Sequence, residues 1–97
     1  MKNRKSVESF RDPLRHIINL TRSSIITEKK GLKNSQKMLE NYLKMISKYG
    51  FPIDKTTFEN VMMFSNEINR YERLIQENNE KIKELKYQIA ECEREYL

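Results

Sequence analysis

The sequence has few of the residues that break regular structure or cross-link a chain. Its 97 residues include two Gly, two Pro, one Cys, one His and no Trp. A strand-and-turn fold needs a turn residue every 8–12 positions or so, and this chain cannot supply them. A single Cys excludes an internal disulfide and favours a reducing compartment. We therefore expect an all-α chain in the cytoplasm, or in the host cytoplasm if its origin is viral.

Long hydrophobic runs are also lacking. The longest is Val61-Met62-Met63-Phe64, whereas a membrane-spanning helix needs roughly 20 apolar residues. The basic start Lys2-Asn3-Arg4-Lys5 is followed by polar residues and not by an apolar stretch, so we expect no secretory signal. The sequence thus predicts a chain with no membrane partner.

Residues suited to catalysis or metal binding are equally scarce. His16 is the only histidine, and Asp12 and Asp54 are the only aspartates. Both aspartates stand where a helix-capping residue would stand. No Gly-rich phosphate loop, Cys/His cluster or nucleophile beside a base is visible. We expect no enzymatic activity, no cofactor, no metal and no small-molecule substrate.

What the chain does have is an apolar pattern at helical spacing. In the second half, steps of three and four connect Val61, Phe64, Ile68, Tyr71, Ile75, Asn78, Ile82, Leu85, Ile89, Cys92 and Tyr96. No Gly or Pro interrupts residues 54–97, and Asp54 offers an N-cap. A sustained repeat of 3.5 residues predicts a helix over about 54–97 with a coiled-coil seam. Asn78, the polar exception, is expected to fix the register.

The first half carries a similar but less apolar seam, which runs through Leu14, Ile18, Thr21, Ile25, Glu28, Leu32, Ser35, Leu39, Tyr42, Ile46 and Tyr49. Asp12-Pro13 is a typical helix start. It predicts a helix over about 12–49 after a basic, flexible lead of residues 1–11. Because the seam keeps its phase across Gly31, we favour one continuous helix. The alternative is a three-helix arrangement with a break near Gly31.

A turn at residues 50–53 separates the two predicted helices. Gly50 suits the left-handed position after a helix, and Pro52 prevents the helix from continuing. Two long helices joined by a short turn fold back antiparallel. Residues 1–55 carry 13 Lys/Arg and 5 Asp/Glu, and residues 56–97 carry 6 and 9, so opposite net charges also favour pairing. We predict one helical-hairpin domain over 12–97.

Apolar residues outside the seam make the predicted interface wider than two helices need. They are Ile17, Ile26, Met38, Leu43, Met45, Phe58, Met62, Met63 and Leu74. Three or more apolar positions per heptad are typical of bundle helices. We therefore expect two hairpins to form a homodimeric four-helix bundle, or one hairpin to dock on a larger partner.

Methionine and phenylalanine are concentrated around the turn. The candidate protein-binding tip consists of Met45, Phe51, Phe58, Met62 and Met63. Thioethers and aromatic rings suit adaptable protein contacts, although the same residues could fill the wide end of a bundle core. The leading hypothesis is a non-enzymatic interaction module, such as a small adaptor, inhibitor or assembly factor, encoded by a phage or mobile element.

A row of basic residues on the first helix supports an alternative. At about 100° per residue, one arc of that helix holds Arg11, Arg15, Arg22, Lys29, Lys33 and Lys37. Such a row could contact the phosphates of DNA or RNA, or it could be a solvated helix face. No aromatic side chains alternate with the basic ones to stack on bases. The alternative function is a nucleic-acid-binding module.

Overall fold

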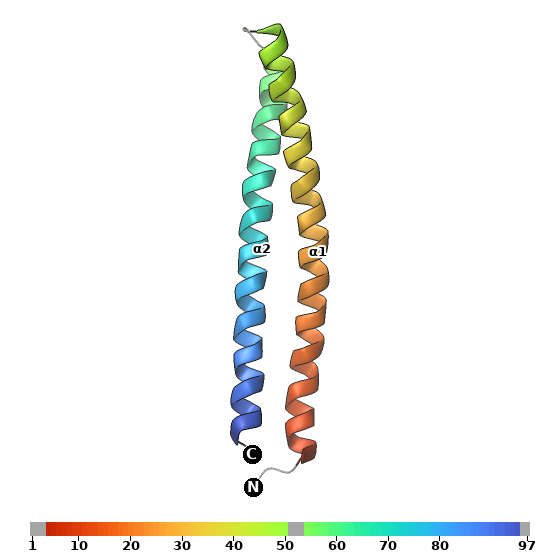
Figure 1. The fold of residues 1–97 in the computed structure, drawn as a ribbon, viewed down its shortest axis with the longest axis vertical. Helices are drawn as coiled ribbons and strands as arrows, with labels where there is room; N and C mark the ends of the chain where they lie inside the picture. The colour runs from red at the N-terminus through yellow and green to blue at the C-terminus, as the bar shows by residue number, and fades with distance from the viewer. Residues whose placement is uncertain (1–3, 51–53, 96–97) are drawn as a thin grey trace. The chain divides into compact units, whose positions relative to one another are not determined.

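The computed structural model describes residues 4–50 and 54–95. It consists of two long helices, α1 (Arg4–Tyr49) and α2 (Lys55–Glu95), which pack against each other as a hairpin (Figure 1). The all-α prediction and the hairpin are confirmed. The helix α1 runs through Gly31 without a break, as the constant phase of the seam predicted.

The start of α1 differs from the prediction. The helix begins at Arg4 and not near residue 12, so that Pro13 lies inside it. Residues 4–11, predicted as part of a flexible lead, belong to the helix. Proline has no N–H for the fourth preceding carbonyl and normally bends or ends a helix. The segment before Pro13 is held on α2 by Arg11, whose guanidinium pairs with Glu93 at 3.6 Å. This contact is one that the local sequence cannot show.

The two helix ends at the turn follow the predicted chemistry. Gly50 has φ +75°, and its N–H donates to the carbonyl of Ile46 at 2.7 Å. This left-handed glycine with a bond back to the last turn is a common helix C-cap. Asp54 Oδ1 accepts from the backbone N–H of Thr57 at 2.6 Å and thereby caps α2. The predicted turn residues 51–53, Pro52 among them, lie outside the described residues.

The hairpin consists of two compact units. Unit 1 pairs the beginning of α1 with the end of α2 (Met1–Ile26 and Gln76–Leu97). It contains five buried hydrophobic side chains, those of Ile18, Ile25, Ile82, Leu85 and Ile89. All five are predicted seam residues, so the period of 3.5 identified this core correctly. Thr21 is buried among them, and its hydroxyl donates to the carbonyl of Ile17 within α1.

Unit 2 (Thr27–Ile75) has a different interior. Its only buried side chain among the described residues is Ser35, at 2% exposure. Ser35 Oγ donates to Glu67 Oε2 across the helix pair at 3.1 Å. Nearby, the ring of Tyr71 lies against Gly31, and a Cβ on that glycine would come within 2.5 Å of Tyr71 Cζ. Gly31 therefore provides space for an aromatic ring from the opposite helix.

Candidate protein-binding site

The tip patch, defined here as Met45, Phe58, Met62 and Met63, lies in unit 2. All four side chains are exposed, by 39–53%, and Leu43 of the same unit is 51% exposed. Phe51, the fifth predicted tip residue, lies outside the described residues. Methionine and phenylalanine are usually buried, so these exposed side chains make this part of the chain a candidate contact surface.

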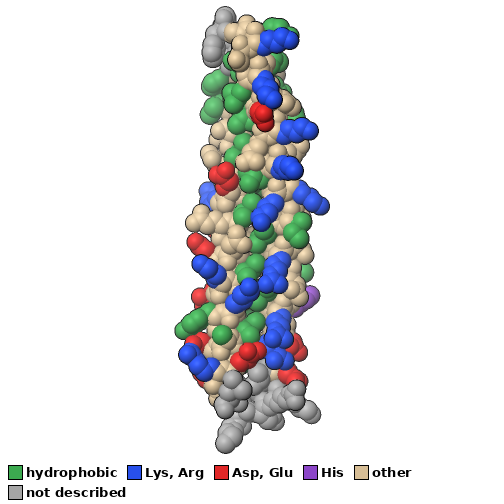
Figure 2. Space-filling view, viewed as in Figure 1, with side chains coloured by type: hydrophobic (Ala, Val, Ile, Leu, Met, Phe, Trp, Pro, Cys, Tyr) green, Lys and Arg blue, Asp and Glu red, His purple; other side chains and the backbone are tan. Residues whose placement is uncertain are grey.

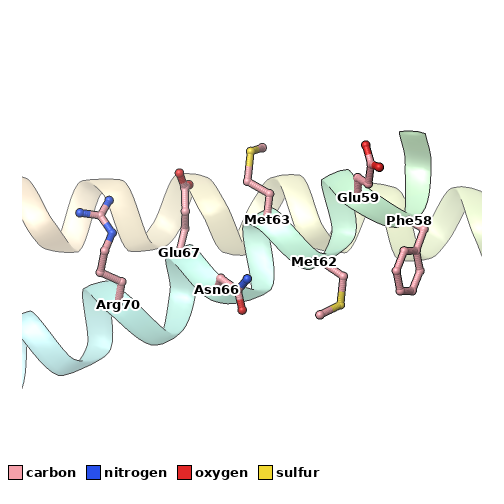
Figure 3. Close-up of a pocket in the computed structure, with 7 residues that line it drawn as sticks. All are labelled: Phe58, Glu59, Met62, Met63, Asn66, Glu67 and Arg70. Carbon is pink, nitrogen blue, oxygen red and sulfur yellow. The ribbon is translucent and has the colours of Figure 1, made fainter. Parts of the chain in front are cut away.

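A shallow pocket lies on α2 within the patch. It is lined by Phe58, Glu59, Met62, Met63, Asn66, Glu67 and Arg70. Figure 3 shows Phe58 and Met62 on one side of α2 and Met63 on the other. The pocket thus combines aromatic and thioether groups with two carboxylates and one guanidinium, which is the composition of an apolar contact with a polar rim.

Contacts across the helix pair position the patch. The rings of Tyr42 on α1 and Phe64 on α2 have centroids 5.9 Å apart and are tilted by 30°. The amide of Asn60 donates to the hydroxyl oxygen of Tyr42 at 3.1 Å. These seam contacts direct Met62 and Met63, which lie between Asn60 and Phe64 in sequence, away from α1. The exposure of the two methionines therefore follows from the helical period.

The cap of α2 stands one turn before Phe58. The backbone N–H of Thr57 donates to Asp54, and this bond lowers the pKa of the Asp54 carboxyl below its usual 3.8. The negative charge also interacts favourably with the free N–H groups at the helix start. The cap fixes where α2 begins and hence the angular position of Phe58 and Met62.

The predicted basic row divides between the two units. In unit 1, Arg11 and Arg15 both pair with Glu93 at 3.6 Å, and Arg11 also lies 3.6 Å from Asp12. These two arginines therefore hold α1 on α2. Arg22 in unit 1 is exposed and forms no ion pair within the part of the chain that the structure describes.

Lys29, Lys33 and Lys37 of unit 2 are likewise exposed, with no ion-pair partner among residues 4–50 and 54–95. Figure 2 shows Lys and Arg side chains following α1. The structure thus separates the predicted row into two structural arginines and four solvated cations.

The remaining predicted residues have these positions. Asn78 is half-buried in unit 1, at its predicted seam position in α2. His16 is exposed, and Cys92 is a free, partly buried thiol. Among the described residues, no three His, Cys, Asp or Glu side chains gather as metal ligands would. Neither described helix has a stretch long and apolar enough to cross a bilayer.

The sequence matches no protein-family model, and neither a curated protein nor a solved structure resembles it significantly.

Sequence reasoning missed the polar rim of the pocket. Glu59, Asn66 and Arg70 were not predicted as site residues, although each stands three, four or seven positions from a tip residue on α2. Because residues at these spacings share a helix face, the spacing could have identified them once α2 was assigned.

Proposed function

We propose that the chain is a non-enzymatic protein-interaction module that binds another protein through the tip patch. Its partner presents an apolar surface to Met45, Phe58, Met62 and Met63, and complementary polar groups to Glu59 and Arg70. A small adaptor, inhibitor or assembly factor of a phage or mobile element would act in this way.

The burial pattern carries this proposal. Unit 1 encloses five hydrophobic side chains, whereas unit 2 has no buried hydrophobic side chain among its described residues. Unit 2 nevertheless exposes the tip patch and Leu43. Burying apolar surface contributes about 25 cal/mol per Å², so covering these side chains is favourable and a partner protein can provide the cover.

Self-association is the second part of the proposal. Two hairpins forming a four-helix bundle would cover the off-seam residues that a single hairpin leaves in water, such as Leu20 and Ile26, which are 56% and 57% exposed. The wide apolar pattern of both helices supports a bundle over an isolated pair.

Nucleic-acid binding is the alternative function. It is favoured by Arg22, Lys29, Lys33 and Lys37, which are exposed without an ion-pair partner in the described part of the chain. Cations of this kind release counterions when they meet phosphates, so such binding would weaken steeply as salt increases.

A comparison of two variants tests the two functions. Met62→Ser with Met63→Ser removes the thioethers of the tip, and Arg22→Glu with Lys29→Glu reverses charge in the basic row. Each tagged variant is purified from the native cells beside the unchanged chain. Co-purifying proteins are quantified by mass spectrometry, and nucleic acid is quantified by the ratio of absorbance at 260 and 280 nm.

Tyr87→Ser provides the control for the tip variant, because Tyr87 is 61% exposed and lies in unit 1. We expect a protein that is retained by the unchanged chain and by Tyr87→Ser but lost from the tip variant, and a purified partner should show the same difference in titration calorimetry. If binding is lost only on charge reversal and nucleic acid co-purifies, the alternative is correct. Equal recovery by all variants contradicts both.

A further inference from the structure

The beginning of α1 precedes a proline that interrupts its backbone hydrogen bonding. Residues 4–12, called here the leading segment, end directly before Pro13, which lies inside the helix. Because proline has no N–H, the carbonyl of Ser9 cannot accept the usual helical bond from residue 13. A shallow pocket lined by Glu8, Ser9, Asp12 and Pro13 lies at the same point. The interruption leaves a short helical segment, and short helices need tertiary contacts to persist in water.

An ion pair at Arg11 joins the leading segment to α2. Nη1 of Arg11 lies 3.6 Å from Oε1 of Glu93, and both residues belong to unit 1. None of the side chains described for residues 8–12 is buried, and the ring of Phe10 is 47% exposed. The attachment of this segment therefore depends on charge more than on apolar contact, in contrast to the buried isoleucines farther along α1.

Glu93 is shared between two guanidinium groups. Nη2 of Arg15 also lies 3.6 Å from Oε1, the same oxygen that Arg11 contacts. Arg15 stands on the other side of Pro13 in α1. When Arg11 leaves, Glu93 therefore keeps a cation beside it, and its carboxylate is not left unpaired. The free energy lost on release is smaller than it would be for a carboxylate that Arg11 alone neutralises.

The docked position of Arg11 also has a cost. Its Nε is buried and donates no hydrogen bond within the described residues 4–50 and 54–95. Oδ1 of Asp12 lies 3.6 Å from this nitrogen, which is longer than a hydrogen bond. A buried donor without an acceptor is destabilising, and release returns it to water. Because the side chains of Arg11 and Glu93 are 26% and 39% exposed, salt also screens their attraction.

We propose that the leading segment is a salt-sensitive latch. At low ionic strength the ion pair between Arg11 and Glu93 holds it on α2. At high ionic strength the pair is screened, and the segment separates from α2 with Pro13 as the hinge. Cys92, which is half-buried directly before Glu93, becomes more accessible on release. The latch lies in unit 1 and the tip patch in unit 2, so this inference goes beyond the proposed function and does not depend on it.

Hydrogen exchange of the amides of residues 8–12, measured by mass spectrometry, tests the release. Raising NaCl from about 20 to about 500 mM shortens the Debye length from about 20 to about 4 Å. It should speed this exchange about two- to fivefold, the amount that a partly exposed ion pair contributes. Glu93→Gln removes the charge that Arg11 contacts and should give fast exchange at both salt concentrations. The matched control Glu84→Gln removes an exposed carboxylate that accepts from Gln88 within α2, and it should behave as the unchanged chain.

Pro13→Ala should act in the opposite direction. Alanine restores an N–H for the carbonyl of Ser9 and continues the helix through the hinge. We expect slower exchange in residues 8–12 and a salt effect of less than about twofold. Labelling of Cys92, the single thiol, by a neutral maleimide should be faster at high salt in the unchanged chain and slow at both salt concentrations in Pro13→Ala. Circular dichroism confirms that each variant remains helical.

The outcomes separate the latch from a general opening of the helix pair. Exchange in residues 8–12 that neither salt nor Glu93→Gln changes, or that Glu84→Gln speeds equally, overturns the latch. Parallel acceleration at the amides of Ile82 and Ile89 also overturns it, because the core of unit 1 would then open as a whole. Faster exchange with constant labelling of Cys92 overturns the uncovering of this thiol while the latch itself stands.

Discussion

Replacing Gly31 by alanine should destabilise the hairpin, although alanine is the better helix former. Through helix propensity alone, the substitution should raise the free energy of unfolding by about 1 kcal/mol. It also places a Cβ 2.5 Å from Tyr71 Cζ and 2.8 Å from Tyr71 Cε1 and Oη. Over-packing of this kind costs about 1–3 kcal/mol. We therefore expect the free energy of unfolding to fall by about 1 kcal/mol, the balance of the two effects.

The surroundings of Tyr71 decide how much of that clash is relieved. The ring is half-buried, and the guanidinium of Arg70 lies 4.7 Å from its centroid. Rotation of the ring away from α1 would give up both its contact with Gly31 and this cation–π contact. The clash is thus only partly avoidable.

A double-mutant cycle isolates the contact. After Tyr71→Ala has removed the ring, Gly31→Ala should raise the stability by about 1 kcal/mol, because only helix propensity remains. The expected coupling energy is about 2 kcal/mol, within the range for residues in contact. Urea unfolding followed by circular dichroism, at one protein concentration, measures all four chains. If Gly31→Ala were stabilising by the same amount with and without the ring, the proposed role of Gly31 would be refuted.

The remaining predictions concern a buried hydroxyl and a helix cap. Ser35→Ala removes the hydroxyl that donates to Glu67 and should lower the free energy of unfolding by about 1 kcal/mol. The exposed control Ser47→Ala should change it by less than about 0.5 kcal/mol. Equal effects of the two substitutions in urea unfolding would contradict the importance of the hydrogen bond. Because the folded pKa of Asp54 lies below 3.8, its charged cap contributes stability above that pH and loses it as the pH falls through the lower folded value. Asp54→Asn should therefore show a smaller loss of thermal stability between neutral and strongly acidic pH than the unchanged chain, and an identical pH profile would rule out this linkage.

The seam could be predicted from sequence because it depends on the period alone. Ile18 and Ile25 in α1, and Ile82 in α2, fall on steps of three and four and are buried in unit 1. The caps at Gly50 and Asp54 were also predictable, since each depends on residues within one turn. Local chemistry was sufficient wherever the determining contacts are local.

Two features required knowledge of the opposite helix. Asp12-Pro13 looks like a helix start, and only the ion pair between Arg11 and Glu93 shows what holds the preceding turn in place. The seam phase predicted a continuous helix through Gly31, but the reason for a glycine at this position is visible only from the ring of Tyr71 that lies against it. Each depends on the register between distant segments, which neither segment encodes by itself.

The location of the buried hydrophobic residues has a consequence for how the protein folds. Ile18 and Ile25 are synthesised before Ile82, Leu85 and Ile89, yet these residues form one core. During translation this core cannot close until Ile89 has left the ribosome, because its contacts join segments far apart in sequence. The part of α1 that contains Ile18 and Ile25 therefore remains without these partners on α2 until that point, whereas unit 2 can pair earlier.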